Sequence, residues 1–550
     1  MSARHWKRSR TSLRHLPIAA VAALVLAGCS GAPQEKGAAA GGEAPPLVIH
    51  AIDAGSFQED FNPFHLEGVN FGSTGMIYET LEFVNKLKPG ESTPWLATKH
   101  EWADKGKTLT ITLRQGVKWS DGTPFTADDV AFTFDTLKKH PELNTGALDL
   151  TGTTVLAPDK VELDFGSTSY AKLYNIVGNR AIVAKHLFEK ENPVTFTNPK
   201  PVGTGPYVLS AFSSQLYEMK KNPAYWQPGK PVVPTLRFPA YTANAVQSGL
   251  QQGEIDWAGA FVPDIDKIYV QGQPETNKYY FPPEGLVSLY LNLTKPAFAK
   301  PEVRQAISLA VDRDRIVKVA ERDYTTVAHP SGVPMPGGDA YLPPEHKDAE
   351  YAVDVAKAKQ LLQQSGVNPA ELSFTLLVPS PYTDWVNAAQ LIREDLAKIG
   401  VKVETRGVAF QDWVSKVGKG TYDMTIRGTP GGPTPYSALR TLLDGDLAKP
   451  VGTSSSGNYE RWKDGETDKL IADYAATDDQ AAQEQAVQGL GKIMVEKLPV
   501  LPLFYSPAWS QYRTGKYVGW PSEQDPYAMP SPYTSPDAAV VLLHLRPAGT

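Results

Sequence analysis

The sequence predicts an α/β fold with a mostly parallel sheet. Residues 372–378, LSFTLLV, form a continuous apolar run that is typical of a buried strand. Asp384 is placed to cap a helix that carries an apolar face as far as Leu396, and Gly400 would end it. Residues 401–405, VKVET, then alternate as a strand. This strand–helix–strand order implies a βαβ crossover between parallel strands.

The other elements are justified by local patterns in chain order. Folded sequence is expected to begin with a β-rich run at residues 47–53, LVIHAID, and residues 108–113 alternate as a strand. Thr126 followed three residues later by Asp129 matches a capping box, which predicts the start of a helix. Residues 301–320 begin with proline and place apolar residues three and four apart, which predicts one amphipathic helix.

The first 28 residues have the pattern of an export signal. Five basic residues precede an apolar run from Leu16 to Leu26, which is shorter than the roughly 20 residues that span a bilayer. Cys29 follows in the sequence LAGC, which resembles the motif at which bacterial lipoproteins are cleaved and acylated. The alternative is an unmodified thiol at the cleavage site. Residues 30–46 are rich in Gly, Ala and Pro, so we expect a flexible tether there.

Composition and motifs exclude several classes of function. The formal net charge is −6, and would be −11 without the signal, so no basic field is available for nucleic acid. A single cysteine excludes an internal disulfide. The chain lacks the common zinc-protease, nucleophile-elbow and dinucleotide-binding motifs, and its ten histidines have no metal-ligand spacing. We therefore expect no metal and no cofactor, although a secreted glycosidase with widely separated carboxylates would escape such a search.

Nine stretches, in order along the chain, identify a family. The chain resembles the family 5 extracellular solute-binding proteins of ATP-binding-cassette (ABC) importers, the oligopeptide- and dipeptide-binding group. The stretches that carry the resemblance are DFNPF (60–64), IYETL (77–81), LRQGVKWSDGTPFTADDVAFTF (113–134), VGTGPYVL (202–209), KNPAYW (221–226), GEIDW (253–257), VRQAISLAVDRDRIV (303–317), AKAKQLLQQSG (356–366) and LAKIGVKVE (396–404).

The resemblance implies a bilobal periplasmic-binding-protein fold of type II with an additional inserted domain. A two-segment hinge would lie near residues 286–291 and 498–503. The implied protein is a monomer and not an enzyme. It is lipid-anchored outside the cytoplasmic membrane, and it delivers its solute to a membrane permease. The expected divisions are a signal peptide (1–28), a tether (29–46), domain I in three parts (47–78, 203–287 and 500–550), domain II (79–202) and domain III (288–499).

The loop Gly428–Tyr436, GTPGGPTPY, bears on the solute. Its prolines lack N–H groups and no Lys-Ser/Thr pair or phosphate-binding helix follows, so a phosphate site is not expected. In peptide-binding members of the family an aspartate near this position pairs with the peptide ammonium, but here no acidic residue occurs until Asp444. We expect glycines that admit a neutral ligand close to the backbone and prolines that stiffen the loop. A surface turn without ligand contact is the alternative.

Four stretches resemble the cellobiose- and oligosaccharide-binding branch of the family: 56–64, 253–261, 281–294 and 431–436. Sugars bind flat aromatic faces and neutral polar groups. An oligosaccharide is therefore the expected solute, an oligopeptide is the alternative, and a secreted glycosidase comes third. Trp257 and Trp385 could stack on sugar rings or serve as ordinary packing. The expected ligand-binding residues are Trp257, Trp385, Tyr382, Asn292, Thr434, Tyr436 and Phe57.

Overall fold

The computed structural model describes residues 44–65, 69–335 and 337–549. Its largest sheet has seven strands in the order β12-β18-β11-β1-β10-β9-β8, with β1 parallel to β10 and β11 and the other pairs antiparallel. The strands are β1 (Leu47–His50), β8 (Tyr207–Ser213), β9 (Leu216–Lys221), β10 (Thr235–Pro239), β11 (Trp257–Ala258), β12 (Asn277–Tyr279) and β18 (Gln511–Arg513). The predicted signal, Cys29 and most of the tether lie outside the described residues.

A five-stranded sheet has the order β15-β14-β16-β13-β17. Its strands are β13 (Pro283–Leu291), β14 (Ser373–Pro379), β15 (Lys402–Val408), β16 (Met424–Pro430) and β17 (Leu501–Pro507). Strand β14 pairs in parallel with β15 and β16, whereas β13 is antiparallel to both of its neighbours. The predicted crossover is thus confirmed, but the sheet is mixed rather than mostly parallel.

The helix of this crossover, α9 (Thr383–Ala397), lies between β14 and β15 as the apolar pattern predicts. Gly400 adopts a left-handed conformation with φ +84° just after the helix. The predicted cap is wrong by two residues: Tyr382 precedes the helix, and Asp384 lies inside its first turn. A carboxylate there still favours the helix, because it faces the positive end of the helix dipole.

A four-stranded antiparallel sheet, β4-β5-β7-β6, packs against α1 (Ala127–Lys139). The predicted strand 108–113 is β5, and both hydrogen bonds of the predicted capping box at Thr126 and Asp129 are present. The strands of this sheet are β4 (Ala97–Ala103), β5 (Thr108–Leu113), β6 (Leu150–Ala157) and β7 (Lys160–Phe165). Two small pairs are β2 (Glu82–Val84) with β3 (Ser92–Pro94), and β19 (Tyr517–Val518) with β20 (Arg546–Pro547).

The predicted helix 301–320 is two helices, α6 (Pro301–Ala310) and α7 (Arg313–Val319). The break occurs because the Asp312 side chain accepts a hydrogen bond from the backbone N–H of Arg315 and caps a new helix. The remaining helices are α2 (Lys185–Phe188), α3 (Ala243–Gln252), α4 (Ile265–Ile268), α5 (Pro296–Ala299), α8 (Val355–Gln364), α10 (Phe410–Gly418), α11 (Pro435–Leu443), α12 (Gly465–Ala475), α13 (Gln480–Lys497) and α14 (Asp537–His544).

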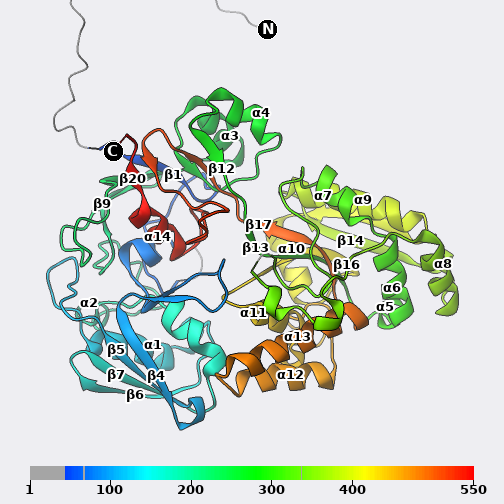
Figure 1. Cartoon of the computed structure of the whole chain (residues 1–550), viewed down its shortest axis with the longest axis horizontal. Coiled ribbons are helices and arrows are strands. Elements are labelled where there is room, and N and C mark those ends of the chain that lie inside the picture. Colours follow the sequence, from blue (N-terminus) through cyan, green and yellow to red (C-terminus); the bar gives the residue numbers. More distant parts are fainter. Residues whose placement is uncertain (1–43, 66–68, 336, 550) are drawn as a thin grey trace, which may run out of the picture. The chain divides into compact units, whose positions relative to one another are not determined.

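The chain passes twice between the two large sheets, from β12 to β13 and from β17 back to β18. We call residues 283–507 the second lobe and the described residues on either side of them the first lobe (Figure 1). The crossings fall at residues 280–282 and 508–510, a few residues outside the stretches predicted for a hinge. None of the helices described between residues 44 and 549 is long and apolar enough to span a bilayer.

Candidate functional site

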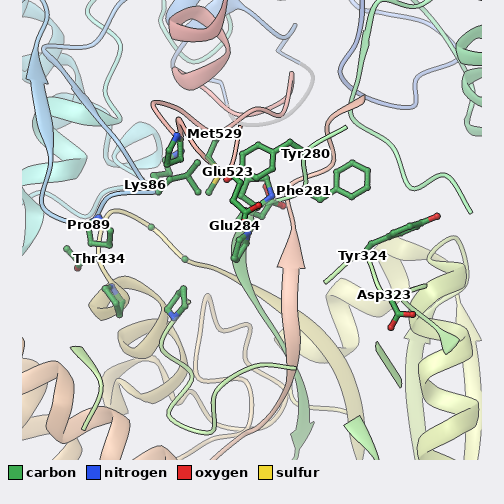
Figure 2. A pocket seen from close by; sticks show the side chains of 18 residues that line it. Lys86, Pro89, Tyr280, Phe281, Glu284, Asp323, Tyr324, Thr434, Glu523 and Met529 are labelled. Carbon is green, nitrogen blue, oxygen red and sulfur yellow. The ribbon is translucent and has the colours of Figure 1, made fainter. Parts of the chain in front are cut away.

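A cavity of about 520 Å³ is lined by both lobes where the chain crosses between them. This volume falls in the range of small-molecule sites. The view in Figure 2 places Tyr280, Phe281 and Glu284 between Thr434 on one side and Tyr324 with Asp323 on the other. The lining therefore combines segments that are far apart in the sequence and that meet only in the folded chain.

The loop Gly428–Tyr436 forms one wall of this cavity through Gly431, Gly432 and Thr434. The backbone N–H of Gly431 donates to the carbonyl oxygen of Glu284 at 2.9 Å, and a Cβ at Gly431 would lie 3.0 Å from that oxygen. Gly432 has φ +77°, and a Cβ there would lie 2.5 Å from the Cβ of Ser437. Gly432 is therefore favoured both by its positive φ and by the close Ser437 side chain, whereas a Cβ at Gly431 would press against the Glu284 carbonyl oxygen.

A helix opens from this loop, although the loop lacks the features of a phosphate-binding turn. Thr434 is the N-cap of α11 and Pro435 is its first residue, which suits proline because the first turn needs no N–H from it. The Thr434 hydroxyl lies 3.1 Å from the hydroxyl of Tyr474. Thr434 is the one predicted ligand-binding residue among those that line the cavity.

The cavity is rich in carboxylates that sequence reasoning missed. Glu284, Asp323 and Glu523 line it together with a single amine, Lys86. The Lys86 ammonium forms an ion pair with the buried Asp537 at 3.2 Å. Burial raises the pKa of Glu284 to about 7, and the charge of Lys86 and a hydrogen bond from the hydroxyl of Tyr533 oppose that rise.

Aromatic side chains accompany these charges. Tyr280, Phe281 and Tyr324 line the cavity, and the ring of Phe281 packs edge-on against Tyr324 and Trp509 at centroid distances of 5.8 and 4.9 Å. A possible sequence signal was the segment YYFPPEG at residues 279–285, where aromatic residues and prolines immediately precede the long strand β13. These prolines indicate a stiff connection between the lobes, but the segment gives no sign that it lines a cavity.

The structure places Trp257 in the core and not on the cavity. Its side chain is 0% exposed in strand β11, and its indole N–H donates to the carbonyl oxygen of Pro530 at 2.9 Å. The ring packs edge-on against Trp520 with centroids 5.3 Å apart. A sugar could reach neither face of this indole in the present conformation, so the expected stacking role does not fit.

Trp385 and Tyr382 lie in a second aromatic group, near the ends of β14 and β15. Tyr382 is 39% and Phe410 is 37% exposed, and the rings of Tyr382 and Trp385 pack edge-on at 5.1 Å. The Trp385 ring covers the backbone of Gly428, where a Cβ would lie 3.7 Å from it. These aromatic side chains are accessible from solvent but do not line the 520 Å³ cavity.

The last three predicted residues make contacts within the protein. The buried Asn292 side chain donates to the carbonyl oxygens of Gly420 and Tyr422, at 2.9 and 2.8 Å. These two hydrogen bonds hold the loop that precedes β16. Tyr436 is buried and stacks on Tyr474 with centroids 3.6 Å apart. Phe57 packs edge-on against Tyr217 at 4.9 Å. None of the three lines the 520 Å³ cavity.

The described residues form no evident metal site. Within the described ranges, no group of three or more His, Cys, Asp or Glu side chains is arranged to hold a metal ion. The cavity offers aromatic faces, carboxylates and loop backbone.

Comparisons with known proteins find relatives that match most of the chain. Di/tripeptide-binding protein 1 of Pseudomonas aeruginosa is 28% identical over 452 residues, which cover 76% of this chain and 82% of that protein. A periplasmic oligopeptide-binding protein of an ABC transporter from Thermotoga maritima is 26% identical, with a TM-score of 0.83 over 91% of this chain and 99% of that one. A mannohexaose-bound structure of that protein gives a TM-score of 0.78 over 92% of this chain and 99% of that one, also at 26% identity.

These likenesses confirm the predicted type II periplasmic-binding-protein fold. Residues 91–449 match the model of the bacterial extracellular solute-binding proteins, family 5. This stretch covers more than half of the chain and includes most of the second lobe. The chain therefore belongs to the bacterial extracellular solute-binding proteins of family 5.

Proposed function

We propose that this protein captures an oligosaccharide with flat, cellobiose-like rings in the cavity between its lobes and delivers it to the permease of an ABC importer. The observation that carries the proposal is the make-up of the cavity. Tyr280, Phe281 and Tyr324 offer aromatic faces, while Gly431 and Gly432 let the backbone approach a ring closely. Aromatic faces pack against the C–H faces of sugar rings, and the neighbouring polar groups can bond to hydroxyls.

Two further observations support an oligosaccharide. The loop from Gly428 to Leu443 contains no carboxylate at the place where peptide-binding members pair with an ammonium. The Thermotoga maritima protein, which has the same fold, is described with mannohexaose bound.

An oligopeptide is the second candidate solute. The Pseudomonas aeruginosa relative is a di/tripeptide-binding protein, and the carboxylates of the cavity come from segments other than the loop. A secreted glycosidase is the third and weakest candidate.

We also propose that Cys29 carries a lipid and holds the protein at the outer face of the cytoplasmic membrane. A tether of 17 residues would span roughly 20–25 Å on average, which keeps the receptor near the permease and raises its effective concentration there. We expect the protein to act as a monomer.

A thermal-shift screen tests the solute class. The purified protein is heated with cellobiose, longer β-linked gluco- and manno-oligosaccharides, and di- to pentapeptides. A ligand at 100 times its dissociation constant adds about 2.7 kcal/mol to the free energy of unfolding, which is readily seen as a raised midpoint. Stabilisation by peptides alone would replace the oligosaccharide proposal with the peptide one, and release of shorter sugars during incubation would favour the glycosidase.

A further inference from the structure

Four aromatic side chains meet where the two lobes and both crossing segments come together. Phe261 belongs to the first lobe, Phe281 and Trp509 to the two crossing segments, and Tyr324 to the second lobe. Five pairs among these rings pack edge-on, with centroids between 4.9 and 6.2 Å apart. Edge-on pairs are stabilising beyond the area that they bury, so this cluster, which we call the brace, joins all four segments.

Polar contacts beside the brace also link the two lobes. Tyr324 packs against a first-lobe core that includes Val262 and Ile265, and its hydroxyl is hydrogen-bonded to the backbone of both residues. The guanidinium of Arg322 lies 3.6 Å from the carboxylate of Asp264. These contacts join the start of α4 to the turn after α7 (Figure 1). Rings, hydrogen bonds and an ion pair therefore act together on this side of the molecule.

The lobes meet again at residues 170–172, but with weaker contacts. Ala171 of the first lobe packs against the core of the second lobe, and α12 lies beside it. Among the described residues, neither a hydrogen bond nor an ion pair joins residues 170–172 to the second lobe. Like charges face each other instead: burial lowers the pKa of Lys172, and the charge of Arg440 in α11 lowers it further, while Asp149 opposes the change.

The cavity between the lobes extends from the strong contact toward the weak one. Tyr324 lines it on the side of the brace, and Thr434, the N-cap of α11, lines it on the other side (Figure 2). Regions with few apolar contacts and few hydrogen bonds separate at a lower cost in free energy than densely packed ones. The two sides of the cavity therefore differ in how readily they open.

We propose that the brace is the fixed side of the hinge, and that the cavity opens on the side of α11 and α12, where residues 170–172 separate from the second lobe. A solute then enters past Thr434 and Arg440, while the contacts of Tyr324 stay in place. Hinge motions of this kind confine the change of backbone angles to a few residues. The proposal concerns the solute-free protein and goes beyond the proposed function, because it does not depend on which solute is bound.

Distances between paired spin labels in the solute-free protein test the direction of opening. Cys29→Ala removes the chain's own cysteine, and each pair of labels then joins one exposed position in each lobe. Thr145→Cys with Ala476→Cys spans the side of residues 170–172, because Thr145 precedes Gly146, whose carbonyl oxygen accepts from Lys172. Lys267→Cys with Val319→Cys spans the side of the brace, in α4 and α7.

We expect the distance distribution of the first pair to be at least twofold broader than that of the second. Equal widths, or a broader distribution for the second pair, overturn the proposal. Both widths are measured without solute, so this result and the outcome of the solute screen are independent of each other.

Phe261→Ala, with Phe212→Ala as its matched control, assigns the effect to the brace. Phe212 is half-buried like Phe261, but it packs edge-on against Phe61 within the first lobe, at 6.0 Å. We expect Phe261→Ala to broaden the distances of the second pair at least twofold and Phe212→Ala to leave them narrow. Trp509→Ala should act as Phe261→Ala does, and it decides the question if Phe261→Ala fails to fold. Unfolding midpoints show which variants are folded, and an unchanged second distribution in a folded brace variant overturns the proposal.

Discussion

The hydroxyl of Tyr324, in the second lobe, accepts a hydrogen bond from the backbone N–H of Ile265, in the first lobe, at 2.8 Å. The same hydroxyl donates to the carbonyl oxygen of Val262 at 3.2 Å. Next to it, the guanidinium of Arg322 lies 3.6 Å from the carboxylate of Asp264. Because Tyr324 also lines the cavity, one side chain contacts both the opposite lobe and the space for the solute.

Tyr324→Phe should therefore weaken solute binding. The substitution keeps the ring but removes the hydroxyl that bridges Ile265 and Val262. The loss of one hydrogen bond and the partner groups left unpaired predict a roughly 5- to 20-fold weaker affinity. Calorimetry with the solute identified by screening measures it. Tyr241→Phe is the control, since that hydroxyl bonds Glu254 at 3.3 Å within the first lobe. Equal affinities of the two variants would show that the contact of Tyr324 with the first lobe does not contribute to solute binding.

Gly432→Ala should disturb the loop wall of the cavity. The position combines φ +77° with a Cβ that would lie 2.5 Å from the Cβ of Ser437. Gly229→Ala is a matched control, because Gly229 has φ +75° and nothing within 4 Å of such a Cβ. Both variants bear the left-handed strain of about 1–2 kcal/mol, and only Gly432→Ala adds the clash. We expect a lower unfolding midpoint and weaker solute binding for Gly432→Ala than for the control; similar values would refute this role of the loop.

Trp257→Ala should destabilise the fold without a direct effect on binding. Its indole is fully buried and bonded to Pro530, so truncation leaves a large cavity in the first lobe. We expect a loss of about 3–5 kcal/mol in the free energy of unfolding, measured by denaturant titration. Trp385→Ala is the companion variant, since its ring is partly exposed beside Tyr382. Reduced affinity in a stable Trp257→Ala protein would restore that residue to the site.

The stability of the protein should depend on the pH through Glu284. Burial raises the pKa of this group from its ordinary value of 4.5 to about 7 in the folded protein. The folded state then holds a proton more tightly than the unfolded state, so this contribution to stability is full below about pH 4.5 and is lost as the pH rises to about 7. Glu284→Gln removes this loss. Allowing for partial exposure, we expect the variant to gain on the order of 1–3 kcal/mol relative to the unaltered protein across that window. Denaturant midpoints on either side of the window measure the gain, and a constant difference would contradict it.

Cys29→Ala should abolish lipid attachment. Cys29 is the one cysteine of the chain and ends the LAGC motif. Metabolic labelling with a fatty acid, followed by fractionation of membranes, measures the effect, and Ser30→Ala is a control that leaves the cysteine in place. We expect the unfolding midpoint of the folded body to remain unchanged. Continued labelling of Cys29→Ala would show that another residue carries the lipid.

The sequence by itself determined those features that depend on neighbouring residues. The β14–α9–β15 crossover follows from apolar periodicity and Gly400, and the start of α1 follows from Thr126 and Asp129. Family membership also follows from the sequence, because short blocks along most of the chain keep their order. Even among local features, the break between α6 and α7 was missed, since Asp312 is equally compatible with a continuous helix until its side chain turns back to cap.

The tertiary structure alone decided which residues form the cavity. Lys86, Glu284, Tyr324 and Gly432 lie on four separate segments. Only the packing of the two lobes beside the crossing segments 280–282 and 508–510 brings them together. Trp257 and Tyr280 illustrate the limit: both are aromatic, yet Trp257 is buried in the core and Tyr280 lines the cavity. Local sequence determines how a side chain faces its own strand or helix, whereas its exposure to a solute depends on distant segments that either cover it or leave it open.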